Sequence, residues 1–252
     1  VEVPYLGMEH QSSVTYGNKY LKGYLGRDRS NTGWGLLFDY IIIHEAGHEW
    51  FANNITVKDA ADLWVHEGFT CYSESLFLDY YYGKKAASEY IIGLRRGIRN
   101  QEPLIGPYNV NKEGSSDMYD KGANILHTLR QLIGNDEKWR QILRGLNKTF
   151  YQQTVTSKQI ETYISEQSGI DLTAFFNQYL RTTEIPTLEY TIDNYQLKYR
   201  WTNILEQFDM PIVIKFENKT QWIYPNSEWK SMHLEGSSFE IDPNFYIFTR
   251  KL

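Results

Sequence analysis

The feature that most constrains this chain is the five-residue run His44-Glu45-Ala46-Gly47-His48. Residues four apart lie one turn apart on the same face of an α-helix, so the two histidines can bind one ion if the run is helical. Imidazoles at this spacing, with a glutamate beside the first, are typical of a zinc site in which the glutamate acts as a base. Two surface histidines on a helix would give the same run, so the run alone leaves that alternative open.

Two helices are expected around this run. From Trp34 onward, apolar side chains recur at helical spacing. The pattern stops at Asn53-Asn54, residues that tolerate the left-handed conformation of a helix cap. A second helix is predicted from about Asp62 to Tyr81, ending at Gly83.

A tetrahedral zinc ion needs a third protein ligand when one position is left for water. Glu67, on the second predicted helix, is the candidate. It lies between Trp64 and Phe69, where burial of an acid is costly unless the acid meets a cation. An exposed helix glutamate is the alternative interpretation.

The rest of the chain divides into helical and β-rich segments. Residues 1 to about 20 predict a strand followed by a loop, and further helices are expected up to about Arg181. Their start and stop signals are Asp117 before Tyr119, Gly134, the capping box of Thr156 with Gln159, and Asp171 before Leu172. After Ile185-Pro186, alternating patterns predict strands over residues 189–192, 212–216 and 245–248.

Composition excludes several classes of function. The net charge of -5 arises from intermixed acids and bases, without the run of Lys or Arg that would bind nucleic acid or an anionic membrane. No stretch approaches the roughly 18 consecutive apolar residues of a transmembrane helix. The sequence therefore predicts a soluble chain and leaves cytoplasmic and exported locations both open. The single cysteine, Cys71, cannot form an internal disulfide.

The string HEAGHEWFANNITVKDAADLWVHEGFTCYSE, with eighteen residues between His48 and Glu67, strongly resembles the aminopeptidase N-like zinc metallopeptidases. This gluzincin family includes leukotriene hydrolase. The run Leu6-Gly7-Met8-Glu9-His10 is similar to the family's Gly-Ala-Met-Glu-Asn exopeptidase motif and matches it at Met8 and Glu9. The run Tyr119-Asp120-Lys121-Gly122 is similar to the family's Tyr-x-Lys-Gly motif.

The resemblance implies an α+β fold in two parts. Residues 1–184 are expected to form a thermolysin-like, mainly helical zinc-peptidase domain that lacks its beginning. Residues 185–252 are expected to form a small, all-β, sandwich-like domain. Position 1 is Val and the first residues resemble the inside of a strand, so we expect a fragment whose missing N-terminal domain completes the cleft.

The resemblance also implies a role for each site residue. His44, His48 and Glu67 are expected to hold one Zn²⁺, and Glu45 to accept a proton from the metal-bound water. Tyr119 is expected to stabilise the oxyanion. Glu9 is expected to bind the α-ammonium of a peptide substrate with a free N-terminus.

Four further residues bear on these assignments. The family usually has Asn where this chain has His10 and His66. The change at His10 affects the expected contacts to the substrate amine. His66 is an alternative metal ligand, but Glu67 holds the family position. Asp62 and Glu74 flank Glu67 and are candidates to hold the second nitrogens of the ligand imidazoles, with a helix cap or a surface charge as the alternative for each.

The sequence thus predicts a zinc-dependent aminopeptidase, with three alternatives. An endopeptidase or an epoxide hydrolase could use the same scaffold, but neither needs an ammonium anchor such as Glu9. A non-catalytic binding module is the third alternative. Glu45 argues against it, because a structural zinc site needs ligands but no base.

Overall fold

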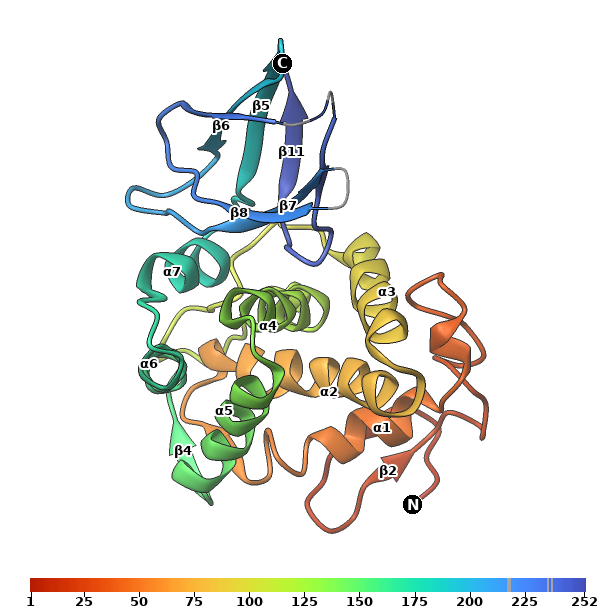
Figure 1. Cartoon of the computed structure of the whole chain (residues 1–252). Helices are drawn as coiled ribbons and strands as arrows, with labels where there is room; N and C mark the ends of the chain where they lie inside the picture. Colours follow the sequence, from red (N-terminus) through yellow and green to blue (C-terminus); the bar gives the residue numbers. More distant parts are fainter. Residues whose placement is uncertain (217–218, 235, 237) are drawn as a thin grey trace.

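The computed structural model describes residues 1–216, 219–234, 236 and 238–252, and it has an α+β fold (Figure 1). Helices occupy the part up to Arg181, and two sheets lie at the opposite end of the molecule near the C-terminus. The α-helices in the described residues are α1 (Tyr40–Gly47), α2 (Trp64–Tyr82), α3 (Lys84–Leu94), α4 (Asp120–Ile133), α5 (Asp136–Thr149), α6 (Ser157–Ser168) and α7 (Thr173–Arg181). Short 3₁₀ turns are η1 (Trp34–Leu36), η2 (Ala60–Asp62), η3 (Arg95–Gly97) and η4 (Ser116–Met118).

The first helix is shorter than predicted. Trp34–Leu36 forms only the turn η1, and α1 begins at Tyr40 because the Asp39 carboxylate accepts hydrogen bonds from the N–H groups of Ile41 and Ile42. The helix ends at Gly47, with His48 as its C-cap and not Asn53-Asn54. His48 keeps a helical backbone conformation, so its side chain still lies one turn from His44.

Most other helix boundaries confirm the predictions. Helix α2 ends at Gly83 with φ of 85°, and α4 ends at Gly134 with φ of 63°. The capping box of Thr156 and Gln159 starts α6. Asp117 was the wrong start signal, because its carboxylate accepts hydrogen bonds from the backbone N–H groups of Arg99 and Asn100.

Helix α2 lies at the centre of the helical part, in contact with α1, α3 and α4. Its close approach to α4 depends on two glycines that face each other. A Cβ atom on Gly122 would lie 2.8 Å from the Gly68 Cα atom, and a Cβ on Gly68 would lie 3.1 Å from the Gly122 Cα. Gly68 follows Glu67, and Gly122 lies three residues after Tyr119, so this contact sets the distance between those two side chains.

The strands of the described residues form four small sheets. Near the N-terminus, β1 (Gly7–Met8) pairs antiparallel with β2 (Thr15–Tyr16). In the helical part, β3 (Ile55–Val57) pairs parallel with β4 (Gln153–Val155). One C-terminal sheet has the order β11 (Phe248–Lys251), β5 (Thr187–Asp193), β6 (Gln196–Thr202), β9 (Lys230–His233). The other has the order β10 (Glu240–Ile241), β7 (Ile212–Phe216), β8 (Lys219–Ile223).

The strand predicted over residues 245–248 is wrong in position. Tyr246 is buried against the helices, Phe245 is buried with its ring on Trp222 of β8, and β11 begins only at Phe248. The Tyr246 carbonyl accepts a hydrogen bond from the Tyr179 hydroxyl, and its N–H donates to Thr128. These bonds use backbone groups that a sheet would otherwise pair.

The helices of the described residues are all too short or too polar to span a bilayer.

The glycine contact gives the first prediction. Gly122→Ala should lower the free energy of unfolding by about 1–3 kcal/mol, because the added methyl group forces α2 and α4 apart in a packed interior. Urea titration followed by circular dichroism measures this change. An unfolding free energy equal to that of the unaltered protein would show that the helices do not depend on this close approach.

Candidate active site

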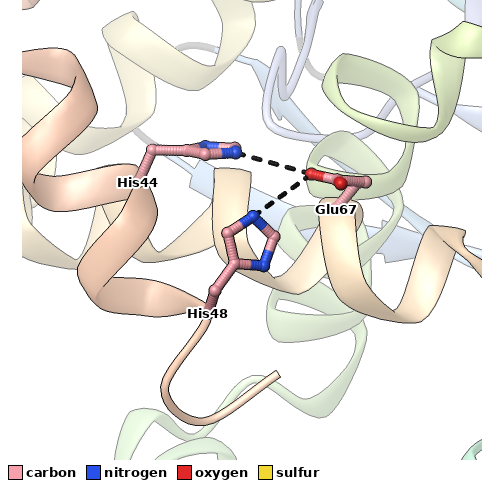
Figure 2. Close-up of side chains that lie close together, drawn as sticks. All are labelled: His44, His48 and Glu67. Carbon is pink, nitrogen blue, oxygen red and sulfur yellow. Dashed lines mark ion pairs between the residues drawn. The ribbon is translucent and has the colours of Figure 1, made fainter. Parts of the chain in front are cut away.

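Three predicted ligands converge at one point between α1 and α2. His44 lies in the last turn of α1, His48 caps that helix, and Glu67 lies in the first turn of α2. Figure 2 shows the Glu67 carboxylate facing both imidazoles, with its Oε2 atom 3.4 Å from His44 Nε2 and 3.5 Å from His48 Nε2. The loop between the helices brings these three donor atoms together although they come from separate helices.

The donor set fits a zinc ion. Ligands about 2.0–2.1 Å from a tetrahedral ion lie roughly 3.4 Å from one another, which matches the two separations. The Oε2 atom of Glu67 is buried and has no hydrogen-bond partner among the described residues. Burial alone would raise the pKa of Glu67, but the two histidines hold it at about 2, so the carboxylate stays charged.

The second nitrogen of each imidazole has its own acceptor. His44 Nδ1 lies 3.0 Å from Glu74 Oε1, and His48 Nδ1 lies 3.1 Å from the Phe51 carbonyl oxygen and 3.1 Å from Thr70 Oγ1. These acceptors assign the proton to Nδ1 in the neutral ring and leave the Nε2 lone pair for a metal. Glu74 therefore contacts the second nitrogen of a ligand imidazole, as expected from the sequence.

The surroundings of His44 favour positive charge. Burial alone would lower the pKa of His44, but hydrogen bonds to Cys71, Glu67 and Glu74 raise it well above its usual range. Glu74 is fully buried, and its Oε2 atom also accepts a hydrogen bond from the Tyr90 hydroxyl. A cation among these acids would stabilise the buried charges.

Glu45 lies beside the ligands, buried, with no hydrogen-bond partner for its Oε2 atom among the described residues. Burial raises the pKa of Glu45 above its usual value, although both histidines lower it. The strand that carries Glu9 approaches it closely, since a Cβ on Gly7 would lie 2.7 Å from Glu45 Oε1. A carboxylate with a raised pKa next to a metal site suits a proton acceptor.

Glu9 and Tyr119 complete the group. Glu9 follows β1, and one carboxylate oxygen lies within 4.8 Å of potential ligand atoms of both Glu45 and His48. Tyr119 precedes α4, and its ring stacks on the His44 ring with centroids 6.0 Å apart. Burial, followed by the charge of Glu67, raises the pKa of Tyr119, so its hydroxyl keeps the proton it could donate.

Three other candidates lie outside the site. His66 points away, because its Nε2 atom accepts a hydrogen bond from the Val57 N–H at 2.9 Å, and burial lowers its pKa to about 4. The Asp62 carboxylate accepts hydrogen bonds from Ser157 and Tyr108 instead of a ligand imidazole. The His10 side chain is exposed and has no hydrogen bond to the described residues.

Thr70 and Cys71 are neighbours of the site that were not predicted from the sequence. Thr70 contacts His48, and the Cys71 sulfur lies within 4.8 Å of potential ligand atoms of His44 and Glu74. These residues lie three and four positions after Glu67, and Glu74 lies seven after it, so all share one face of α2. Helical spacing counted from Glu67 could have identified them.

Comparison with known proteins agrees with this geometry. The model of the peptidase family M1 domain matches residues 2–179. This chain belongs to peptidase family M1. The match confirms the resemblance to aminopeptidase N-like enzymes.

The M1 relatives include several aminopeptidases. Endoplasmic reticulum aminopeptidase 1 of Mus musculus is 28% identical over 157 residues, covering 58% of this chain and 17% of the relative. Aminopeptidase N of Lactococcus lactis is 25% identical over 261 residues, covering 94% of this chain and 29% of the relative.

Two solved structures share the M1 fold. Aminopeptidase A of Legionella pneumophila, in complex with aspartic acid, has a TM-score of 0.66 at 17% identity and covers 94% of this chain and 29% of its own. An M1 zinc metallopeptidase of Deinococcus radiodurans has a TM-score of 0.57 at 22% identity and covers 73% of this chain and 39% of its own. This M1 chain therefore spans at most 39% of the length of these four proteins.

The ligand geometry gives the second prediction. The protein should bind about one zinc per chain, and His44→Ala should lose most of it because one of three protein ligands is gone. Mass spectrometry of the metal after dialysis measures the ratio. His66→Gln is the matched control and should keep its zinc, since glutamine can still accept the Val57 N–H. Zinc retained by His44→Ala, or lost by His66→Gln, would contradict this ligand assignment.

Proposed function

We propose that this M1 chain carries the active site of a zinc-dependent aminopeptidase, which hydrolyses the N-terminal peptide bond of peptides with a free N-terminus. The observation that carries the proposal is the position of the Glu9 carboxylate, within 4.8 Å of potential ligand atoms of Glu45 and His48. An aminopeptidase needs a negative group near the metal to bind the substrate ammonium. The aminopeptidase names of several relatives support the same reaction.

Each group in the proposed mechanism has a distinct task. His44, His48 and Glu67 would hold the zinc ion, and when bound it would supply a Lewis acid that makes water reactive near neutral pH. Glu45 accepts the proton of the attacking water and passes it to the leaving amine. The Tyr119 hydroxyl donates a hydrogen bond to the carbonyl oxygen as negative charge develops there. Glu9 binds the α-ammonium and thereby aligns the first peptide bond with Glu45.

We also propose that the chain divides into two domains. The helical part, residues 1–184, corresponds to a thermolysin-like catalytic domain, and residues 185–252 to a small β domain. The end of α7 at Arg181 and the start of β5 at Thr187 support this division.

A change at Glu9 tests the aminopeptidase reaction against the endopeptidase alternative. Glu9→Gln on the zinc-loaded protein should raise KM for aminoacyl 7-amido-4-methylcoumarins by roughly 10- to 100-fold, because the negative charge that pairs with the substrate ammonium is lost. Glu2→Gln, the same change in the same segment, should behave like the unaltered protein. The proposal fails if Glu9→Gln cleaves these substrates normally, or if N-acetylated peptides are cleaved as well as free ones.

A change at Tyr119 should alter kcat more than KM. Tyr119→Phe should lower kcat by roughly 10²- to 10³-fold with little change in KM, since its hydroxyl contact strengthens only as the oxyanion forms. Steady-state kinetics with zinc content measured in parallel separates this effect from metal loss. A kcat close to that of the unaltered protein would assign Tyr119 to packing against His44.

A further inference from the structure

The turn that follows α1 connects the metal ligands to the segment that carries Glu9. Within this turn, Asn53 donates a hydrogen bond from Nδ2 to the Glu9 carbonyl oxygen at 3.0 Å. The backbone N–H of Asn53 donates to the His48 carbonyl oxygen at 3.0 Å. One residue therefore bonds both to a proposed metal ligand and to the proposed ammonium anchor.

Glu9 depends on this contact because its own strand is short. Strand β1 ends at Met8, and its ladder with β2 consists of two residue pairs. Glu9 lies just beyond the last pair, so the ladder does not fix its position. The Asn53 side chain provides a hydrogen bond to the Glu9 backbone from a segment 44 residues away in the sequence.

The turn itself is held firmly. Ala52 has φ of 153°, a strained conformation that residues with a Cβ rarely adopt. The contacts of the neighbouring residues hold Ala52 in this conformation. The Ala52 carbonyl accepts a hydrogen bond from Thr56, and the buried Phe51 ring stacks on Phe69 of α2 with centroids 4.5 Å apart.

This stacking links the turn to the third ligand as well. Phe69 lies two residues after Glu67 on α2, and the Phe51 carbonyl lies 3.1 Å from His48 Nδ1. The turn of residues 51–53 is thus fixed to both helices of the metal site. The hydrogen bond from the Asn53 side chain connects this turn to the backbone of Glu9.

We propose that Asn53 is a positioning residue that sets the distance from the metal site to the Glu9 carboxylate. This inference rests on the proposed aminopeptidase function and deepens it. With the ammonium held at a fixed distance, only the first peptide bond of a substrate reaches Glu45 and the metal. Asn53 thereby helps to restrict cleavage to one N-terminal residue.

The test is a double-mutant cycle on the zinc-loaded protein. Asn53→Asp keeps the shape but removes the N–H donor, and Asn53→Ala removes the side chain without adding charge. Each is made alone and together with Glu9→Gln. Asn54→Asp is the matched control, since it adds the same charge one residue away and Asn54 bonds to Asn147 instead of Glu9. The probe is the best-cleaved aminoacyl 7-amido-4-methylcoumarin.

Both Asn53 variants should raise KM by about 3- to 10-fold, the effect of one lost hydrogen bond, with zinc content unchanged and kcat reduced less than KM rises. Asn54→Asp should retain its KM. In the Glu9→Gln background, the Asn53 changes should have little further effect, because the two residues act as one unit.

The outcomes separate this inference from the proposed function. A raised KM in Glu9→Gln with a normal KM in both Asn53 variants would overturn the role of Asn53 alone. An Asn53 effect that persists in full in the Glu9→Gln background would overturn it too. A normal KM in Glu9→Gln would overturn the proposed function and this inference with it.

Discussion

The rest of the structure depends on the Glu67 carboxylate, whose buried Oε2 atom faces two imidazole nitrogens across 3.4 and 3.5 Å. These separations are too long for a good hydrogen bond but suit ligands around a single ion. An unpaired buried carboxylate would be strongly destabilising, so a cation is needed to stabilise it. The approach of α1 to α2 therefore brings together the proposed metal ligands and part of the protein core.

The surrounding elements keep the ligand atoms in place. Glu74 and the Phe51 carbonyl orient the two imidazoles, and the glycine contact between α2 and α4 brings Tyr119 to the same point. Arg29 supplies positive charge nearby, with its guanidinium 2.7 Å from the Asp120 carboxylate and 3.0 Å from the Tyr40 hydroxyl. The Arg29 guanidinium thus offsets part of the negative charge of the acids around the site.

Local rules predicted the features that depend on local physics. The i to i+4 spacing of His44 and His48 and the glycines that end α2 and α4 follow from helix geometry alone. The start of α1 was predicted wrongly because apolar periodicity continued upstream, while the Asp39 cap decided where the helix begins. Contacts between distant segments, such as Asn53 with Glu9 and His66 with Val57, could not be read from the sequence.

The change to alternating patterns after Ile185-Pro186 likewise predicted the strands β5 and β7, yet the strand predicted over residues 245–248 is misplaced. Alternation alone cannot distinguish an aromatic residue that faces a sheet from one that packs on a helix. Phe245 packs on Trp222 of β8 with ring centroids 5.9 Å apart, and Tyr246 contacts the helical part through its hydrogen bonds with Tyr179 and Thr128. Their burial comes from tertiary packing and not from a strand.

The most direct test of this account is anomalous diffraction at the zinc edge from crystals of the zinc-loaded protein. The account predicts a single strong peak about 2.0–2.2 Å from His44 Nε2, His48 Nε2 and a Glu67 carboxylate oxygen. A peak bound to other residues, or no peak between α1 and α2 in zinc-loaded crystals, would contradict it.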